Sequence, residues 1–163
     1  MAERITRRRV LGTLGVLGAA AAMGVPALPR PAVAQQPEFG GQEAVGDALK
    51  RLFGTRPIKD GGALVKLDIP LIAENGAVVP ITVDVTSPMT PANYVKHVYV
   101  VADKNRIPII TRVSLAPESG QASVSTSVRL GETGDVRAIV EQSDGTLVQV
   151  KREVKVTVGG CGG

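Results

Sequence analysis

Hydrophobic and polar residues alternate along most of the chain after residue 62, which is the pattern of β-strands with one buried face. The first such stretch reads Ala-Leu-Val-Lys-Leu-Asp-Ile over residues 63–69 and continues to residue 73. Six further stretches follow, each bounded by turn-forming residues. The predicted strands cover residues 63–73, 78–86, 94–102, 107–115, 122–130, 136–142 and 147–158.

Turn signals separate these strands at intervals of roughly 8–12 residues, as in an immunoglobulin-like β-sandwich. Asn75-Gly76 predicts a type I′ hairpin turn, because both central positions of that turn require positive φ. Ser143-Asp144-Gly145 predicts a second hairpin, and Pro108 indicates a sheet edge or a strand start. About 100 residues suffice for one core. We therefore predict an all-β, immunoglobulin-like sandwich of about seven strands over residues 61–158.

One helix is predicted before the sandwich, over residues 42–53 of an N-terminal helical segment that spans residues 35–60. Val45, Leu49 and Phe53 fall on one side at helical spacing. Gly54 is a suitable stop for the helix. The sequence leaves open whether the apolar side packs on the chain's own sandwich or faces a partner.

Residues 1–34 have the pattern of an export signal peptide, with basic residues before a moderately apolar stretch and Ala32-Val33-Ala34 at the expected cleavage site. Arg7 and Arg8, in a basic run followed by a hydrophobic pair, favour the twin-arginine route over a general secretory signal. The apolar stretch is too short to serve as a membrane anchor. We expect the mature chain in the bacterial periplasm, exported folded and with a partner assembled before export.

Removal of the signal changes the charge of the protein. The full chain has 19 Lys and Arg against 15 Asp and Glu, and residues 1–34 hold 5 of the basic and 1 of the acidic residues. The remaining 14 basic and 14 acidic residues balance, so binding to nucleic acid or to an anionic membrane has no electrostatic support. Two Phe, two Tyr and no Trp also leave no platform for stacking bases.

The only cysteine, Cys161, stands in the terminal sequence Gly159-Gly160-Cys161-Gly162-Gly163. Glycine has no side chain, so this sequence predicts a thin, flexible arm that extends roughly 10 Å from Val158 to Cys161. A buried cysteine is disfavoured because the arm has no apolar face, and an internal disulfide needs a second cysteine. A reactive or carrier thiol is the favoured interpretation, with an incidental surface cysteine as the alternative.

No motif for catalysis, metal binding or cofactor binding accompanies this thiol. The sequence holds no phosphate-binding loop and no His-Glu-x-x-His pattern. His97 lies in mid-strand, far in sequence from Cys161, so we expect it to be structural and predict no metal site. We therefore predict a protein that is not an enzyme and binds no cofactor, and whose one reactive group is Cys161.

Three segments resemble the SoxY family, the sulfur-carrier subunits of the bacterial thiosulfate-oxidising Sox system. They are residues 94–105, residues 134–145 and the terminal Gly-Gly-Cys-Gly-Gly motif. The resemblance implies that Cys161 holds the pathway intermediates covalently, as an S-thiosulfonate and related adducts, while separate enzymes act on them. It also implies a stable heterodimer with a SoxZ-like subunit. Transient docking is implied to a c-type cytochrome coupling enzyme, a sulfate-releasing hydrolase and a sulfur dehydrogenase.

Two rival interpretations stay open at this point. Ubiquitin-like sulfur carriers also end in Gly-Gly and load the terminal glycine as a thiocarboxylate, which here would be Gly163. Their adenylation requires ATP, which is absent from the compartment that the signal predicts. The second rival is a structural or adhesion sandwich with an incidental terminal cysteine. Adducts on Cys161, on Gly163 or on neither residue distinguish the three interpretations.

Overall fold

The structure, a computed structural model, describes residues 40–159. These residues form one α-helix, one 3₁₀ turn and nine strands. In chain order the elements are α1 (Val45–Phe53), β1 (Ile58–Asp60), β2 (Val65–Asp68), β3 (Ile72–Ala73), β4 (Val79–Val85), β5 (Val95–Ala102), β6 (Ile109–Ser114), η2 (Pro117–Ser119), β7 (Ala122–Val128), β8 (Gly134–Gln142) and β9 (Leu147–Val156). The predicted signal peptide, with Arg7 and Arg8, lies outside the described residues, as do Gly160, Cys161, Gly162 and Gly163.

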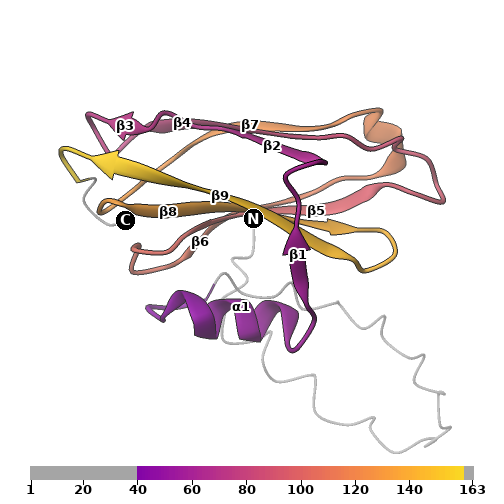
Figure 1. The fold of residues 1–163 in the computed structure, drawn as a ribbon, viewed down its shortest axis with the longest axis horizontal. Helices are drawn as coiled ribbons and strands as arrows, with labels where there is room; N and C mark the ends of the chain where they lie inside the picture. The colour runs from indigo at the N-terminus through magenta and orange to yellow at the C-terminus, as the bar shows by residue number, and fades with distance from the viewer. Residues whose placement is uncertain (1–39, 160–163) are drawn as a thin grey trace, which may run out of the picture. The chain divides into compact units, whose positions relative to one another are not determined.

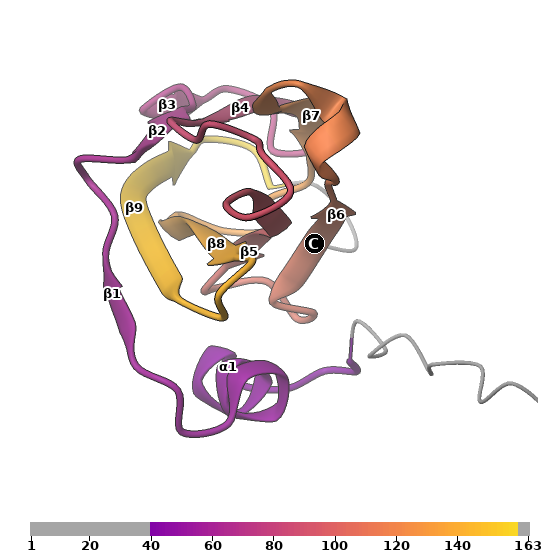
Figure 2. The same cartoon turned by 90° about the vertical axis from the view of Figure 1, so that its right-hand side faces the viewer.

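The strands form two sheets. The larger sheet has the order β1-β9-β8-β5-β6, with β3 also paired to β9, and the smaller sheet has the order β2-β4-β7. Pairing is antiparallel throughout, except that β1 and β3 run parallel to β9. Figures 1 and 2 show three layers, with the small sheet, the large sheet and α1 stacked in that order. The predicted immunoglobulin-like β-sandwich is confirmed.

The main core lies between the two sheets and consists mostly of valine from alternate positions of the strands. Val83 of β4, Val98 of β5 and Val140 of β8 are each at most 1% exposed. β-Branched side chains are stiff and pack well on a pleated surface. The alternation of these valines is therefore both the signal that predicted the strands and the source of the core.

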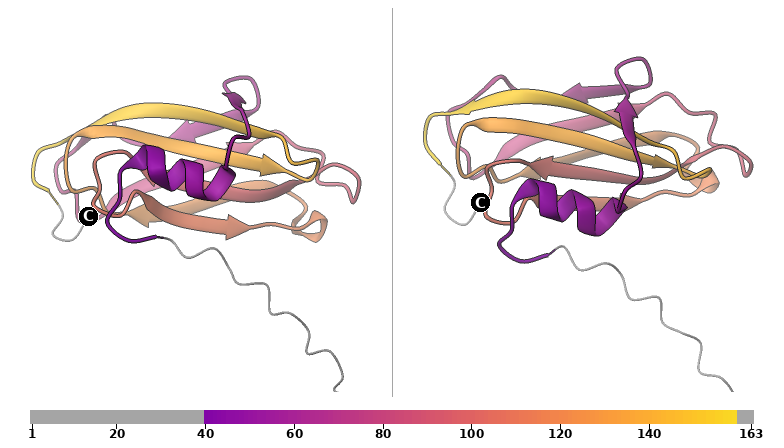
Figure 3. Two further views of the ribbon diagram at one scale, coloured as in Figure 1. Left: turned by 90° about the horizontal axis from the view of Figure 1, so that it is seen from below. Right: turned by 60° about the horizontal axis from the view of Figure 1, so that its bottom comes forward.

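The helix α1 covers the outer face of the large sheet (Figure 3). Ala48 and Phe53 are its buried residues, and the Phe53 ring meets the Tyr99 ring edge to face with 5.1 Å between centroids. Gly54 ends the helix at a φ of 63° and donates its N–H to the Lys50 carbonyl. Of the two alternatives that the sequence left open, the apolar side packs on the chain's own sandwich.

Two details of the predicted strands were wrong. The predicted strand 63–73 is two strands, because β2 belongs to the small sheet and β3 crosses back to pair with β9. The predicted type I′ turn is absent, since neither Asn75 nor Gly76 has positive φ. The Asn75 side chain instead accepts the N–H of Ala77 at 2.9 Å. This segment connects two different sheets, so the short hairpin turn that Asn-Gly favours has no paired strands to join.

The strand count differs for a related reason. β1 and β3 hold three and two residues, too few to give a period-two signal, and β1 lies within the predicted helical segment 35–60. Other turn predictions are confirmed. Gly145 has a φ of 84° in the β8–β9 hairpin, and Pro108 directly precedes β6, an edge strand of the large sheet.

Candidate functional site

Gly159 is the last residue that the structure describes, and Cys161 follows two positions later. Cys161 itself therefore lies outside the described residues. What the structure describes is the point from which the predicted arm starts. We call residues 157–159, which directly follow β9, the arm root.

Backbone hydrogen bonds hold the arm root to the end of β3 and to the segment that follows it. The N–H of Thr157 donates to the Ala73 carbonyl at 3.0 Å, and the N–H of Gly76 donates to the Val158 carbonyl at 2.7 Å. The carbonyl of Gly76 in turn accepts the N–H of Leu130 at 2.7 Å. The end of β9 is thus bonded to the β3–β4 connection, and through it to the loop between β7 and β8.

Gly159 approaches that loop very closely. A Cβ added to Gly159 would overlap the carbonyl oxygen of Gly131, and the atom in the way is backbone, which cannot rotate aside. Only glycine allows the chain to pass this close to another backbone. The sequence had suggested that Gly159 serves chain freedom, and the structure adds a steric requirement at this position.

Asn105 supports the same loop from the turn between β5 and β6. It is 8% exposed, its Nδ2 donates to the Arg129 carbonyl at 2.8 Å, and its Oδ1 accepts the N–H of Gly131 at 2.9 Å. Both hydrogen-bonding groups of one buried side chain are therefore used to hold residues 129–131. Since Gly131 borders Gly159, Asn105 positions the arm root through one intermediate contact.

The turn that carries Asn105 is fixed by an ion pair. Arg137 Nε in β8 donates to Oδ1 of Asp103 at 2.7 Å. The hydrogen bond to Asp103 raises the pKa of Arg137, against the opposing effect of burial. The segment Asp103-Lys104-Asn105, which carries part of the resemblance to SoxY, thus has a physical role beneath the arm root. The sequence alone does not indicate this role, because it depends on contacts with distant residues.

His97 belongs to a different part of the sheet and binds neighbours on β6. Its Nε2 lies 3.1 Å from Nη2 of Arg112. A guanidinium can only donate, so Nε2 accepts and Nδ1 carries the proton, donating to Ser114 Oγ at 3.0 Å. Burial lowers the pKa of His97, and the charge of Arg112 lowers it further, while Glu141 opposes both. These contacts give His97 a structural role between β5 and β6.

Two other features, a metal site and a membrane-spanning helix, concern residues 40–159 as a whole. In this part of the chain no group of three or more His, Cys, Asp or Glu is arranged to hold a metal ion. Within the same residues, no helix has the length and apolar character needed to cross a membrane.

Large apolar side chains are exposed in the segments that hold the arm root. Leu71, Ile72, Val78 and Val158 are each 61–63% exposed. Leu71 and Ile72 stand at the start of the segment bonded to β9, and Val78 at its end. Exposed apolar groups that gather in one region are typical of a surface that contacts another protein.

These features define a class of protein: a small β-sandwich that holds, at one end, the start of a glycine-rich segment with a single thiol. The chain belongs to the SoxY family. The family model of the sulfur oxidation protein SoxY matches residues 49–161, a range that ends at Cys161.

A solved structure supports the family. The sulfur carrier protein SoxY from Chlorobium limicola f thiosulfatophilum is 30% identical, with a TM-score of 0.57 over 69% of this chain and 96% of that chain. No curated protein matches the sequence.

Superoxide reductases share the fold. The enzyme from Ignicoccus hospitalis is 19% identical, with a TM-score of 0.50 over 57% of this chain and 80% of that chain. A putative superoxide reductase from Thermotoga maritima is 17% identical, with a TM-score of 0.52 over 62% and 93%. At these identities the similarity concerns the sandwich alone.

Proposed function

We propose that this protein is a covalent carrier of sulfur intermediates in thiosulfate oxidation, with Cys161 as the attachment residue. The observation that carries the proposal is the SoxY family match, which extends to Cys161 in its Gly-Gly-Cys-Gly-Gly context. SoxY proteins are sulfur carriers, and the chain offers a thiol as the group to be loaded.

The chemistry balances with one thiol and separate enzymes. The Cys161 thiolate and thiosulfate lose two electrons to a c-type cytochrome partner and form the S-thiosulfonate, Cys–S–S–SO₃⁻. Water then releases sulfate and two protons in the site of a hydrolase, leaving the persulfide Cys–S–S⁻. In hosts with a sulfur dehydrogenase, three waters and the loss of six electrons and six protons convert the persulfide to Cys–S–SO₃⁻. A second hydrolysis restores the thiolate.

The carrier itself supplies no catalytic group in this scheme. An ordinary cysteine is only a few per cent thiolate at neutral pH, so we infer that each partner activates the thiol in its own site. The protein needs no resident cofactor, because the cargo is bound covalently.

The arm root supports this proposal. Cys161 can lie at most about 10 Å from Val158. Any enzyme that takes up the thiol must therefore bring its surface to the arm root. There it would meet the exposed side chains of Leu71, Ile72, Val78 and Val158. Because the arm root is fixed and the arm is short, each enzyme that docks there meets the thiol within the same small volume.

The proposal includes a location and a permanent partner. We infer that residues 1–34, with Arg7 and Arg8, export the folded chain to the periplasm by the twin-arginine route. A SoxZ-like subunit forms the stable heterodimer, and the cytochrome, hydrolase and dehydrogenase dock in turn.

Mass spectrometry of the C-terminal peptide from cells grown on thiosulfate tests the function. We expect adducts of thiosulfonate and sulfane mass on Cys161. An adduct on Gly163 would instead support a thiocarboxylate carrier, and the absence of adducts would support a structural sandwich. The variant Cys161→Ser should fold normally and abolish thiosulfate-dependent electron flow. Normal electron flow in that variant would refute the assignment.

A further inference from the structure

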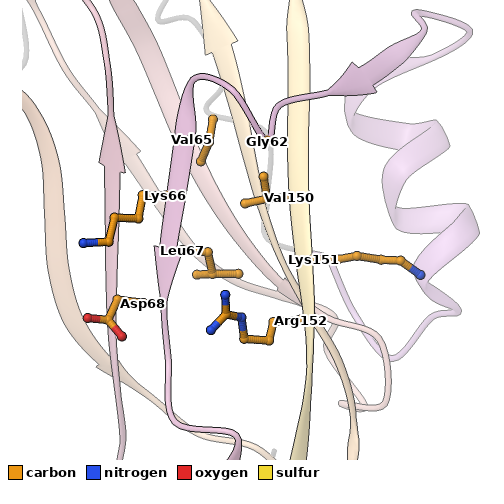
Figure 4. Close-up of a pocket in the computed structure, with 8 residues that line it drawn as sticks. All are labelled: Gly62, Val65, Lys66, Leu67, Asp68, Val150, Lys151 and Arg152. Carbon is orange, nitrogen blue, oxygen red and sulfur yellow. The ribbon is translucent and has the colours of Figure 1, made fainter.

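The free edge of β9 is paired at both ends and unpaired in the middle. β1 pairs with residues 147–149 and β3 with residues 155 and 156. Between β1 and β3 the chain leaves the large sheet and forms β2 in the small sheet (Figures 1 and 4). Within the described residues, no strand pairs with residues 150–154 on this edge. We call this stretch the β9 gap.

Backbone groups of β9 point into the gap. The N–H of Gly61 donates to the Gln149 carbonyl at 2.8 Å, and the N–H of Lys155 donates to a carbonyl just before β3 at 2.9 Å. Peptide groups in a strand alternate in direction from residue to residue. Lys151 and Glu153 therefore direct their N–H and C=O groups to the same side, where β1 and β3 leave them unpaired. Such a row of groups is a template for an added strand.

The gap opens onto a hollow between the two sheets that is lined by both apolar and charged residues. Val65 and Leu67 of β2 and Val150 of β9 line a cavity of about 470 Å³ (Figure 4). A second hollow of about 360 Å³ shares Arg152 with the first and continues to Ile72. An extended peptide seated in the gap would place alternate side chains over these apolar residues.

One positive charge points into the hollow. Figure 4 shows the guanidinium of Arg152 beside Leu67, whereas Lys66 and Asp68 point away from β9 and Lys151 points towards the helix side. Within residues 40–159, no ion pair of Arg152 is found. A carboxylate is the group that best complements a guanidinium, because it can accept two parallel hydrogen bonds.

We propose that the β9 gap is a strand-addition site for a partner protein. From Gln149 to Lys155 the gap spans roughly 20 Å at about 3.3 Å per residue, which accommodates an extended segment of four or five residues. The occupant pairs its backbone with Lys151 and Glu153, places apolar side chains over Leu67, and presents an Asp or Glu to Arg152. Backbone pairing with side-chain pockets is a common mode of peptide recognition.

The position of the gap selects the permanent subunit as the occupant. Lys151 lies seven residues before Val158 along β9, or roughly 23 Å away. Enzymes that take up Cys161 must cover the arm root, so a subunit that stays bound has to sit elsewhere. A strand in the β9 gap leaves Val78 and Val158 open, while Leu71 and Ile72 border the second hollow. This inference rests on the proposed function, which supplies the permanent subunit.

Binding measurements with the purified SoxZ-like subunit of the same organism test the inference. Arg152→Glu places a negative charge opposite the expected carboxylate and should raise the Kd at least about tenfold. Glu153→Pro removes one N–H that faces the gap, at an edge where proline is tolerated, and should raise the Kd about fivefold. The matched charge reversal Lys50→Glu, on the exposed side of α1, should leave the Kd unchanged. Circular dichroism verifies that each variant is folded.

Residue-resolved amide exchange provides a second readout. On binding, the amides of Lys151 and Glu153 should become protected, while those of Arg152 and Val154, which face β8, are slow in both states. Unchanged exchange at Lys151 and Glu153, or loss of binding in Lys50→Glu alone, would overturn the proposed site. Failure of the wild-type chain to bind the subunit would also overturn it. In that case adducts on Cys161 would show whether the carrier function stands without the subunit.

Discussion

Replacing Asn105 with leucine tests whether this buried side chain fixes the loop beside the arm root. Leucine has a similar size but removes the hydrogen bonds to the Arg129 carbonyl at 2.8 Å and the Gly131 N–H at 2.9 Å. Each bond contributes about 1 kcal/mol net, and a backbone group left without a partner costs more. We therefore expect Asn105→Leu to lower the free energy of unfolding by about 2–3 kcal/mol.

Urea denaturation of the mature chain measures this loss. The matched control is Asn75→Leu, which makes the same substitution at an exposed site with a single side-chain bond, to the N–H of Ala77. The control should lose at most about 1 kcal/mol. Equal losses in the two variants, or a loss below about 0.5 kcal/mol for Asn105→Leu, would refute the role assigned to the buried amide.

The same substitution has a functional consequence. Without Asn105, residues 129–131 lose their internal support, and Gly131 no longer holds a fixed distance from Gly159. Under the proposed function, sulfate release from the loaded carrier by the hydrolase should slow several-fold, measured at a temperature where the variant is fully folded. Alkylation of Cys161 by a small reagent should be unchanged, because that reaction requires no docking. Slow alkylation as well would mean that the thiol, and not the arm root, is affected.

Three further predictions follow from single contacts. Gly159→Ala should slow sulfate release several-fold by displacing the arm root. The control Gly46→Ala, in open space on α1, should release sulfate at the wild-type rate and gain up to about 1 kcal/mol of stability. Equal rates of sulfate release in the two variants would contradict the steric argument. The lowered pKa of His97 means that below about pH 6.5 the unfolded chain binds a proton first. The free energy of unfolding should therefore decrease as the pH is lowered below that value, and it should decrease less in His97→Gln. Urea unfolding from pH 7.5 to 5 measures this, and parallel pH profiles of the wild type and His97→Gln would contradict the role given to His97. Phe53→Ala should cost about 3–5 kcal/mol by thermal unfolding, and a loss below 1 kcal/mol would show that α1 is not anchored there.

The sequence predicted the strands that form the core, because the residues that face the space between the two sheets recur mostly at alternate positions. β4, β5, β8 and β9 carry inward valines such as Val83, Val98 and Val140, and each strand was recognised within a few residues of its ends. β1 was not recognised and β3 was merged with β2 into one predicted strand, because both are very short and their pairing to β9 depends on a distant segment. The break at Pro70 between β2 and β3 was not predicted, since local alternation does not indicate which sheet a residue joins.

The candidate site, too, could be predicted from the sequence only in part. Cys161 and its glycines stand out in composition alone, without any knowledge of the fold. The role of Asn105 could not be predicted, because its two bonds reach residues 24 and 26 positions away. No periodic pattern indicates a contact between the turn after β5 and the loop that joins β7 to β8. The β9 gap is equally invisible in the sequence, since it arises from the path of β2 between the two sheets.

The contacts that fix the arm root come from three connections far apart in the chain. The β3–β4 connection binds Val158 through Gly76, and the β7–β8 loop meets Gly159 through Gly131. The turn after β5 supports that loop through Asn105. Each connection is held in place by strands of a different sheet or hairpin, so the position of the arm root depends on the whole sandwich. Under the proposed carrier function, the reach of the thiol from that root is at most about 10 Å, so a change in the sandwich that shifts the root should also change where an enzyme meets the thiol. Variants at the three connections should therefore impair transfer to every enzyme partner alike, whereas a variant in a surface contact of one enzyme should impair that enzyme alone.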